Sequence, residues 1–220
     1  MPVYNSENSL PELVARNAPV LSDLADQFEL ILVNDGSRDG SWQVVEELVT
    51  RYKWVRGINL MRNYGQHNAI LCGIREAHYE VIVTMDDDLQ HPPEEIPRLL
   101  AKLSEGYDVV YGTPQTEQHG LWRDMASRLT KMTLLIIMGA EVARSVGPFR
   151  AFTAHLCDAF ADYRGAVVSI DVLLTWATTR FAAVPVSHTP RQAGMSNYTF
   201  TEEATPKDAG DVCGHCAITI

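Results

Sequence analysis

The sequence predicts an α/β fold with a mostly parallel, Rossmann-like β-sheet flanked by helices. Apolar runs alternate with helical patterns as far as Tyr111, an order typical of parallel strands joined by helical crossovers. Acidic turns follow directly after two of the apolar runs, at the strand ends where such sheets bind ligands. The 220 residues suit one domain, which is expected to span residues 1–200.

The first half of the chain supplies most of the expected sheet. The run FELILV at 28–33 has no polar interruption, as expected for a strand buried on both faces. Ser41 is a suitable N-cap for the helix that follows it, and Pro92 and Pro93 suit the first turn of a later helix. Strands are expected at 28–33, 55–60, 79–85 and 107–111, and helices at 41–52, 65–77 and 92–103.

The second half is less regular. Helices are expected at 122–139, 151–163 and 169–180, and a strand at 181–186, where Pro185 indicates a sheet edge. Residues 201–220 lack apolar periodicity and are expected to form a tail. The pair Cys213 and Cys216 lies in this tail, and no second pair is present to complete a zinc site.

Composition narrows the classes of partner. The formal net charge of −10 and the pI of about 5.1 argue against nucleic-acid binding, which needs a basic surface. The longest apolar-rich run, 132–140, is much shorter than the ~20 residues that cross a bilayer. Without a signal-peptide pattern, the expected location is cytoplasmic, either dissolved or peripheral on the inner membrane face. The apolar helix near 130–139 suits a membrane surface and a protein core equally well.

The acidic run at 86–90 is the first candidate site. On an extended chain, Asp86, Asp88 and Gln90 would share one side. Two carboxylates and an amide oxygen suit Mg²⁺ or Mn²⁺, which would bridge the phosphates of a nucleotide. The competing interpretation is a solvated acidic turn, but the position after an apolar strand favours the metal site.

Other polar residues are predicted at the same sheet edge. Asp35, in the turn NDGS, would accept hydrogen bonds from a base or ribose, although an ordinary β–α turn explains it equally well. Arg62 follows the second strand, and Arg191 lies in a loop that would close over phosphates. For each arginine taken alone, a solvated surface position is the favoured alternative.

Together these strings resemble the family-2 glycosyltransferases of GT-A fold. The resemblance rests on MPVYNSE at 1–7, VNDGSRDGS at 33–41, NYGQHNA at 63–69 and MDDDLQHPPE at 85–94. The strings GPFRAF at 147–152 and R-x-x-G-x-S at 191–196 resemble the branch that contains dolichyl-phosphate mannose synthase and bacterial polyprenyl-phosphate glycosyltransferases. The similarity covers about residues 1–200.

The resemblance implies a role for each candidate residue. It implies nucleotide-binding roles for Pro2, Tyr4, Glu7, Asp35, Arg62, Asp86 and Asp87; metal ligation by Asp86, Asp88 and Gln90; catalytic roles for Asp88, Arg150 and Arg191; and contacts with the acceptor phosphate for Arg123, Arg128 and Ser196.

The implied reaction is an inverting transfer of a sugar from a UDP- or GDP-linked donor to a polyprenyl monophosphate. A phosphate monoester has its second pKa near ~6, so this nucleophile is ionised at neutral pH and needs no strong base. If the acceptor were a saccharide hydroxyl, Asp171 would be the candidate base, although a helix-start carboxylate is the favoured interpretation of Asp171.

Three departures from the family pattern qualify this expectation. The family has an apolar strand directly before the Pro-x-Tyr-Asn turn, whereas this sequence starts at that turn. Asn197 replaces a basic residue of the family, and many relatives continue into membrane helices. A GT-A domain without its first strand is therefore expected, and an inactive nucleotide-binding fragment is the main alternative. A receiver-like signalling domain would need about half this length and a Lys after a late strand.

Overall fold

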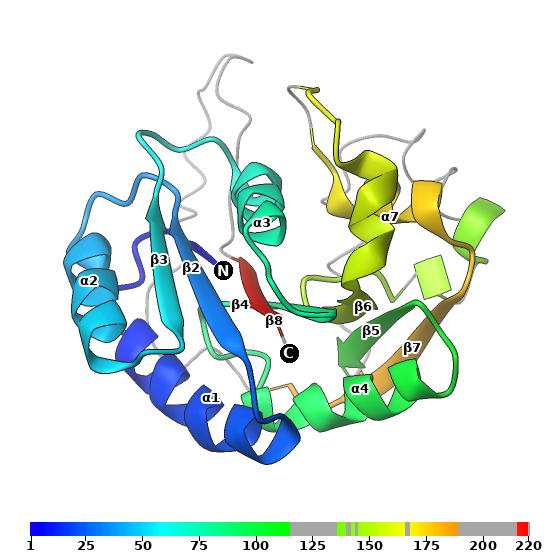
Figure 1. Cartoon of the computed structure of the whole chain (residues 1–220), viewed down its shortest axis with the longest axis horizontal. Coiled ribbons are helices and arrows are strands. Elements are labelled where there is room, and N and C mark those ends of the chain that lie inside the picture. The colour runs from blue at the N-terminus through cyan, green and yellow to red at the C-terminus, as the bar shows by residue number, and fades with distance from the viewer. Residues whose placement is uncertain (115–135, 140–141, 144, 166–167, 189–214, 220) are drawn as a thin grey trace, which may run out of the picture.

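The computed structural model describes residues 1–114, 136–139, 142–143, 145–165, 168–188 and 215–219. These residues form one eight-stranded sheet with helices on both faces (Figure 1). The strands are β1 (Pro2–Val3), β2 (Glu29–Asn34), β3 (Val55–Asn59), β4 (Val81–Asp86), β5 (Val109–Pro114), β6 (Arg150–Thr153), β7 (Phe181–Val186) and β8 (His215–Thr219). The helices are α1 (Leu10–Leu24), α2 (Ser41–Arg51), α3 (Gln66–Arg75), α4 (Ile96–Ser104) and α7 (Ile170–Ala177), with 3-10 turns η1 (Pro93–Glu95) and η3 (Ala154–Phe160).

The sheet is mostly parallel, as predicted. Its order is β1-β2-β8-β4-β6-β5-β7, with β3 paired to β2. The pairings β1–β2, β2–β3 and β5–β7 are parallel, while β6 and β8 run antiparallel to both of their neighbours. Six of the eight strands therefore point in one direction, so that β2, β3 and β4 all end at the same sheet edge.

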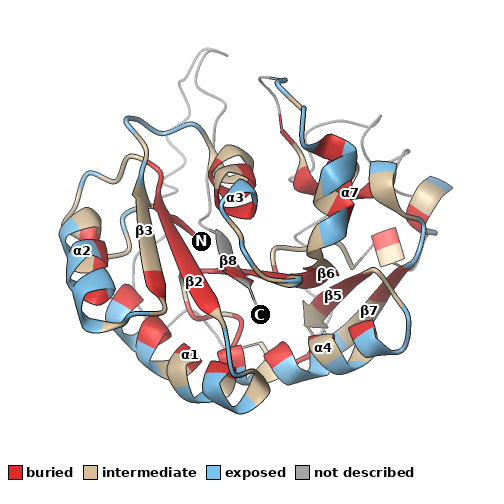
Figure 2. Ribbon diagram, viewed as in Figure 1, coloured by how far each residue is buried: buried red, intermediate tan, exposed pale blue. Residues whose placement is uncertain are grey.

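Alternating side chains along each strand build a core on each face of the sheet. Leu30 and Leu32 of β2 belong to the cluster that contains α1, α2 and α4, whereas Ile31 and Val33 pack against α3. The cluster of α7 and η3 lies on the α3 side. Figure 2 shows the consequence: strand β2 is buried, and the helices expose only their outer faces. A strand covered on both faces is apolar throughout, which explains the continuous run at 28–33.

Helix α1 was not predicted, although its pattern is readable. Its buried residues Leu10, Leu13, Val14, Asn17 and Leu21 follow the three-to-four residue spacing of an amphipathic helix. Pro11 lies in the first turn, where its missing N–H costs nothing. Pro19 lies inside the helix and removes one helical hydrogen bond, which the packing of α1 on the sheet offsets.

The predicted helix at 151–163 is wrong in its first part. Arg150–Thr153 forms β6, which pairs with β4 and with β5. The chain then continues as the 3-10 turn η3 rather than as an α-helix. Pairing on both sides of this short strand outweighs its helix-like spacing. The expected strand at 181–186 is present as β7, and within the described residues it pairs only with β5, as an edge strand.

The expectation of a tail over 201–220 is corrected for its last part. His215–Thr219 forms β8, which lies inside the sheet between β2 and β4. Where a missing first strand was expected, the structure has β1, a parallel strand of two residues. Both β1 and β8 pair with the same edge of β2, β1 at Val33 and Asn34 and β8 at Glu29–Ile31.

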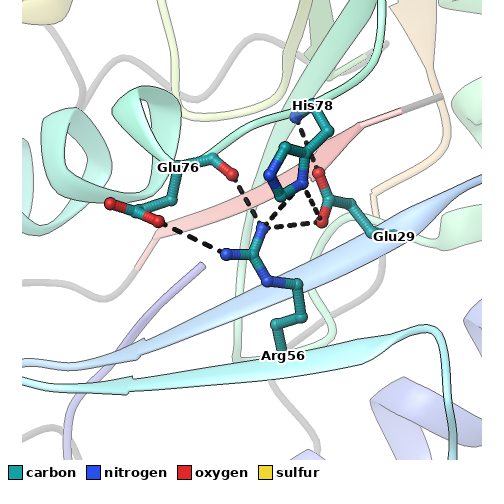
Figure 3. Close-up of polar contacts among 4 residues, drawn as sticks. All are labelled: Glu29, Arg56, Glu76 and His78. Atoms are coloured by element: carbon teal, nitrogen blue, oxygen red, sulfur yellow. Dashed lines mark hydrogen bonds and ion pairs between the residues drawn. The ribbon is translucent and has the colours of Figure 1, made fainter.

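A polar cluster secures the amino-terminal end of the sheet, away from the predicted ligand edge (Figure 3). The buried Glu29 carboxylate accepts hydrogen bonds from Arg56 Nη1 at 2.8 Å and from the His78 backbone N–H at 2.8 Å. Arg56 also donates to the Glu76 carbonyl at 2.7 Å. These contacts join β2, β3 and the turn between α3 and β4 at one point.

Candidate functional site

Two loops at the carboxyl ends of β1 and β2 are held together by side chains. The Glu7 carboxylate accepts a 2.7 Å hydrogen bond from the Gly40 N–H, and the Ser6 N–H donates to Ser41 Oγ at 2.7 Å. A Cβ at Gly40 would lie 2.7 Å from Glu7 Oε2, so a larger residue there would require the Glu7 carboxylate to shift. Glu7, predicted to line a nucleotide pocket, therefore shapes the loop in this structure.

Asp35 fixes the loop that follows β3. Its carboxylate accepts hydrogen bonds from the backbone N–H groups of Tyr64 at 2.7 Å and Gly65 at 3.0 Å, and the residue is fully buried. Burial raises the pKa of Asp35, and the two backbone hydrogen bonds oppose that rise. Asp35 thus lies at the predicted edge and organises the chain from Arg62 to Gly65.

The acidic run begins where β4 ends. Strand β4 stops at Asp86, so the side-chain alternation expected from Asp86 to Gln90 does not continue past that residue. The chain turns instead, with Leu89 at a φ of 63° and the Gln90 N–H donating to Asp88 Oδ1 at 3.0 Å. A turn therefore replaces the expected extended chain after Asp86 and sets Asp88 against the backbone of Gln90.

Asp87 ties this turn to the first loop of the chain. Its Oδ2 accepts hydrogen bonds from Ser6 Oγ and, at 3.4 Å, from the Tyr4 N–H. Burial raises the pKa of Asp87 to about 6, against the effect of the Ser6 hydrogen bond. Because of these contacts, the loops after β1 and β4 form one surface, and Tyr4 lies beside the acidic turn.

The ring of His91, directly after the acidic turn, contacts the rings of Phe149 and His188. The His91 ring stacks on Phe149, with 5.3 Å between ring centroids, and lies edge-on to His188 at 5.4 Å. His91 Nδ1 is 4.0 Å from Asp86 Oδ2. Burial, followed by the neighbouring His188, lowers the pKa of His91 to about 4. His91 is therefore a neutral ring that packs against the end of β4.

Arg150 is the first residue of β6 and lies opposite Thr84 of β4. It is 1% exposed, and its guanidinium bonds to Asp171 and, at 3.1 Å, to Thr84 Oγ1. Tyr111 also donates to Asp171, at 2.9 Å. Arg150 and Asp171 thus belong to one buried network that joins β4, β5, β6 and α7.

The remaining candidates divide into three groups. Pro2 is buried in β1, next to the site loops. Arg62 is exposed, with its guanidinium 4.7 Å above the Tyr64 ring centroid. Arg123, Arg128, Arg191 and Ser196 lie outside the described residues.

Ser6, Asp39 and His91 were not predicted individually, and Ser41 was predicted only as an N-cap, a position that Gly40 takes instead. Ser6 and Ser41 join loops, and Asp39 accepts from the Ser41 hydroxyl at 2.5 Å. His91 is buried beside Asp86. All four lie within the strings that carry the family resemblance, so they were visible as parts of motifs. The contact of Ser6 with Ser41 joins residues that are distant in sequence, and only the fold reveals it.

The donor atoms of the acidic turn suit a hard cation. Within the described part of the chain, no group of three or more His, Cys, Asp or Glu side chains is placed to hold a metal ion. Asp86, Asp88 and Gln90 offer only two carboxylates and one amide, which is the sparse set that Mg²⁺ uses when phosphates and water supply the other ligands. In the described residues, no helix is long and apolar enough to cross a membrane.

Comparison with known proteins agrees with this geometry. The chain is 37% identical, over 201 residues, to the undecaprenyl-phosphate 4-deoxy-4-formamido-L-arabinose transferase of Klebsiella pneumoniae, a match that covers 91% of this chain and 62% of that protein. The chain thus spans less than two thirds of the length of this relative.

Solved structures support the fold. Glucosyl-3-phosphoglycerate synthase from Mycobacterium tuberculosis, in complex with phosphoglyceric acid, aligns with a TM-score of 0.58 at 20% identity, over 86% of this chain and 70% of that chain. The same enzyme with Mn²⁺, UDP-glucose and phosphoglyceric acid aligns with a TM-score of 0.57, also at 20% identity and the same coverage. The profile of glycosyl transferase family 2 matches residues 1–163. With that match across most of its length, the chain belongs to glycosyl transferase family 2.

Proposed function

We propose that this chain carries the donor site of a glycosyltransferase that moves a sugar from a nucleoside-diphosphate sugar to a polyprenyl monophosphate. One structural observation carries the proposal: Asp87 bonds to Ser6 and Tyr4. This contact sets the acidic turn at the end of β4 against the first loop, at the edge where Asp35 follows β2. A base and ribose near Tyr4 and Asp35 would place a diphosphate over Asp86 and Asp88.

The acceptor class rests on the relative from Klebsiella pneumoniae, whose name gives undecaprenyl phosphate as its acceptor. The structure adds one supporting argument. Asp171, the candidate base for a saccharide acceptor, is 7% exposed and paired with Arg150. A phosphate acceptor needs no such base, because its second pKa near ~6 leaves it ionised at neutral pH. A buried Asp171 is therefore compatible with the phosphate acceptor.

The proposed reaction is a single displacement. An oxygen of the acceptor phosphate attacks the anomeric carbon and forms the new bond. The bond from that carbon to the β-phosphate oxygen breaks, and the nucleoside diphosphate leaves with the electron pair. Attack opposite the leaving group inverts the anomeric centre.

The residues of the chain position the two phosphorylated partners. Asp35 holds the loop after β3 in place, and Asp87 holds the acidic turn against Tyr4. Asp86, Asp88 and Gln90 would hold Mg²⁺ or Mn²⁺, which when bound offsets the charge of the leaving diphosphate. Arg123, Arg128, Arg191 and Ser196 remain proposed contacts for the phosphates and the acceptor. The site would then lie on the cytoplasmic face of a membrane, where the chain would bind peripherally.

Substitution of Asp88 tests the metal assignment. We expect Asp88→Ala to lower turnover of a nucleotide sugar with polyprenyl phosphate by at least about 100-fold, since removing one charge-stabilising group typically costs 10²–10³ in rate. The measurement is product formation in a screen of UDP- and GDP-linked donors with Mn²⁺. Asp26→Ala, at an exposed position, is the matched control and should keep full activity.

The outcomes of this screen separate the alternatives. If Asp88→Ala transfers sugar as fast as the unchanged chain, the metal assignment is wrong. If the unchanged chain binds a nucleotide but transfers no sugar to any acceptor, it is a nucleotide-binding fragment. Transfer to a saccharide but not to polyprenyl phosphate would contradict the proposed acceptor.

A further inference from the structure

The structure leaves one space in the middle of the sheet, and a late segment of the chain fills it. One edge of β2 pairs with β3 from Leu30 to Asn34. The opposite edge pairs with β1 at Val33 and Asn34 and with β8 at Glu29–Ile31. On its other side, β8 pairs with β4 from Ile82 to Asp86. Among the described strands, β8 alone pairs with both β2 and β4.

The backbone groups of β2 and β4 that face this space need hydrogen-bonding partners. Leu30 and Ile31 of β2, and Val83 and Thr84 of β4, are fully buried. Helices α1 and α4 pack on one face of the sheet and α3 on the other. Water cannot reach backbone N–H and C=O groups in such a position, so a neighbouring strand must pair with them. The five pairs between β4 and β8 and the three pairs between β2 and β8 meet this need.

One apolar side chain of the segment fits the core. Ile218 is fully buried and belongs to the same cluster as Leu30 and Val83, the two residues with which it is in register. Backbone pairing on two sides with an apolar anchor between them is the usual form of recognition by strand addition.

The segment also reaches the candidate site. His215 is in register with Asp86, so β8 starts at the ligand edge and runs away from it. Its neighbour in the same space is β1, which leads into the loop of Tyr4 and Ser6, and the two strands are in contact. The spacing between the Asp35 end of β2 and the Asp86 end of β4 therefore depends on what lies between them.

We propose that the space between β2 and β4 is a strand-binding site, that the segment His215–Thr219 of the same chain occupies it, and that this segment holds the two acidic strand ends at their working distance. The inference concerns the sheet and does not depend on which sugar or acceptor the chain uses.

Hydrogen exchange on the full chain is the primary test. The amides of 215–219 should exchange at least about 100-fold more slowly than in an unstructured peptide of the same sequence, because core strands open only in rare unfolding events. Ile218→Asp should abolish this protection. Ile136→Asp, at a residue that is 73% exposed, is the matched control and should leave it unchanged.

A complementation experiment tests the binding itself. A chain that ends at Gly214 should unfold at a lower urea concentration than the full chain. A peptide of residues 212–220 should restore the midpoint, and the same peptide with Ile218→Asp should not. Should the shortened chain fail to fold, the exchange experiment on the full chain still decides.

Three results would overturn the proposal. The first is exchange of 215–219 in the full chain at the rate of a free peptide. The second is an unchanged urea midpoint in the shortened chain. The third is protection of 215–219 that disappears on dilution together with a loss of dimer, since this would assign the bound strand to a second copy of the chain.

Discussion

Gly36 lies at the closest approach between two site loops. Its φ is 70°, and a Cβ added there would lie 2.5 Å from the Asn63 nitrogen and 2.6 Å from the Arg62 carbonyl carbon. Both of these are backbone atoms, so a rotamer change cannot relieve the contact. Glycine at this position allows the loop after β3 to reach the Asp35 carboxylate, and the conformation and the close approach both favour it.

Gly36→Ala is expected to lower the free energy of unfolding by more than about 2 kcal/mol, the sum of a strained φ and a backbone clash. Gly147→Ala is the control, because its added Cβ would come no closer than 3.9 Å to a neighbour. Urea unfolding of both variants measures the difference. Equal stability of the two variants would show that the loops do not approach as described.

The Asp35 carboxyl predicts a specific pH dependence. Its folded-state pKa is raised, mainly by burial, so the folded chain holds this proton more tightly than the unfolded chain does. The contribution of Asp35 to stability is therefore largest below its ordinary pKa and falls as the pH rises through the raised value. The difference in unfolding free energy between the unchanged chain and Asp35→Asn should shrink as the pH increases from 4 to 7. A difference that grows over this range would contradict the assignment.

At the scale of elements, the buried network of Arg150 connects four parts of the sheet and its cover. Arg150 of β6 bonds to Asp171 of α7 and Thr84 of β4, and Tyr111 of β5 bonds to Asp171. Burial of two charges carries a desolvation cost that only complete pairing offsets. The network thus fixes how α7 and β6 dock on the strand that ends at Asp86.

Removal of one charged side chain from this network should lower the free energy of unfolding. Arg150→Met is expected to lower the free energy of unfolding by about 3–5 kcal/mol, because it leaves Asp171 buried without its partner. The double variant Arg150→Met, Asp171→Leu should lose less than the sum of the two single variants, as a double-mutant cycle of unfolding measures. Arg180→Met is the control: Arg180 pairs with Asp108 at 3.6 Å while 61% exposed, and such pairs contribute about 0–1 kcal/mol. Additive losses in the cycle would show that the two residues do not interact.

At the scale of the whole molecule, the sequence predicts where strands lie along the chain better than it predicts which strands pair with each other. The strands β2 and β4 were located because their apolar runs are set by burial on both faces, and the acidic turn was located because it follows the apolar run of β4. The half-buried strand β3 was also located. Local pattern could not reveal β6 or β8. Arg150–Thr153 and His215–Thr219 are strands because they pair with residues distant in sequence, and no short-range periodicity records that pairing.

At the candidate site, too, the sequence predicts which residues are present better than it predicts their contacts. Motifs identified Asp35 and Asp86–Gln90 as residues of one edge; in the structure Asp35 directly follows β2, and the acidic run begins at Asp86, the last residue of β4. The contacts that shape the edge, such as Asp87 with Ser6 and Glu7 with Gly40, arise only in the folded chain. The catalytic role that the motif implies for Arg150 stays a prediction, whereas its burial inside β6 and its bond to Asp171 are visible only in the fold.

The central claim is that the edge formed by Asp35 and the acidic turn binds a nucleoside diphosphate through a divalent cation. Isothermal titration of UDP and GDP, with and without Mn²⁺, tests it most directly, on the unchanged chain and on Asp88→Ala. We expect one nucleotide to bind at least about 10-fold more tightly with Mn²⁺, a gain of about 1.4 kcal/mol, and we expect Asp88→Ala to remove that gain while urea unfolding stays unchanged. Binding of neither nucleotide, or Mn²⁺-dependent binding that persists in Asp88→Ala, would contradict the claim.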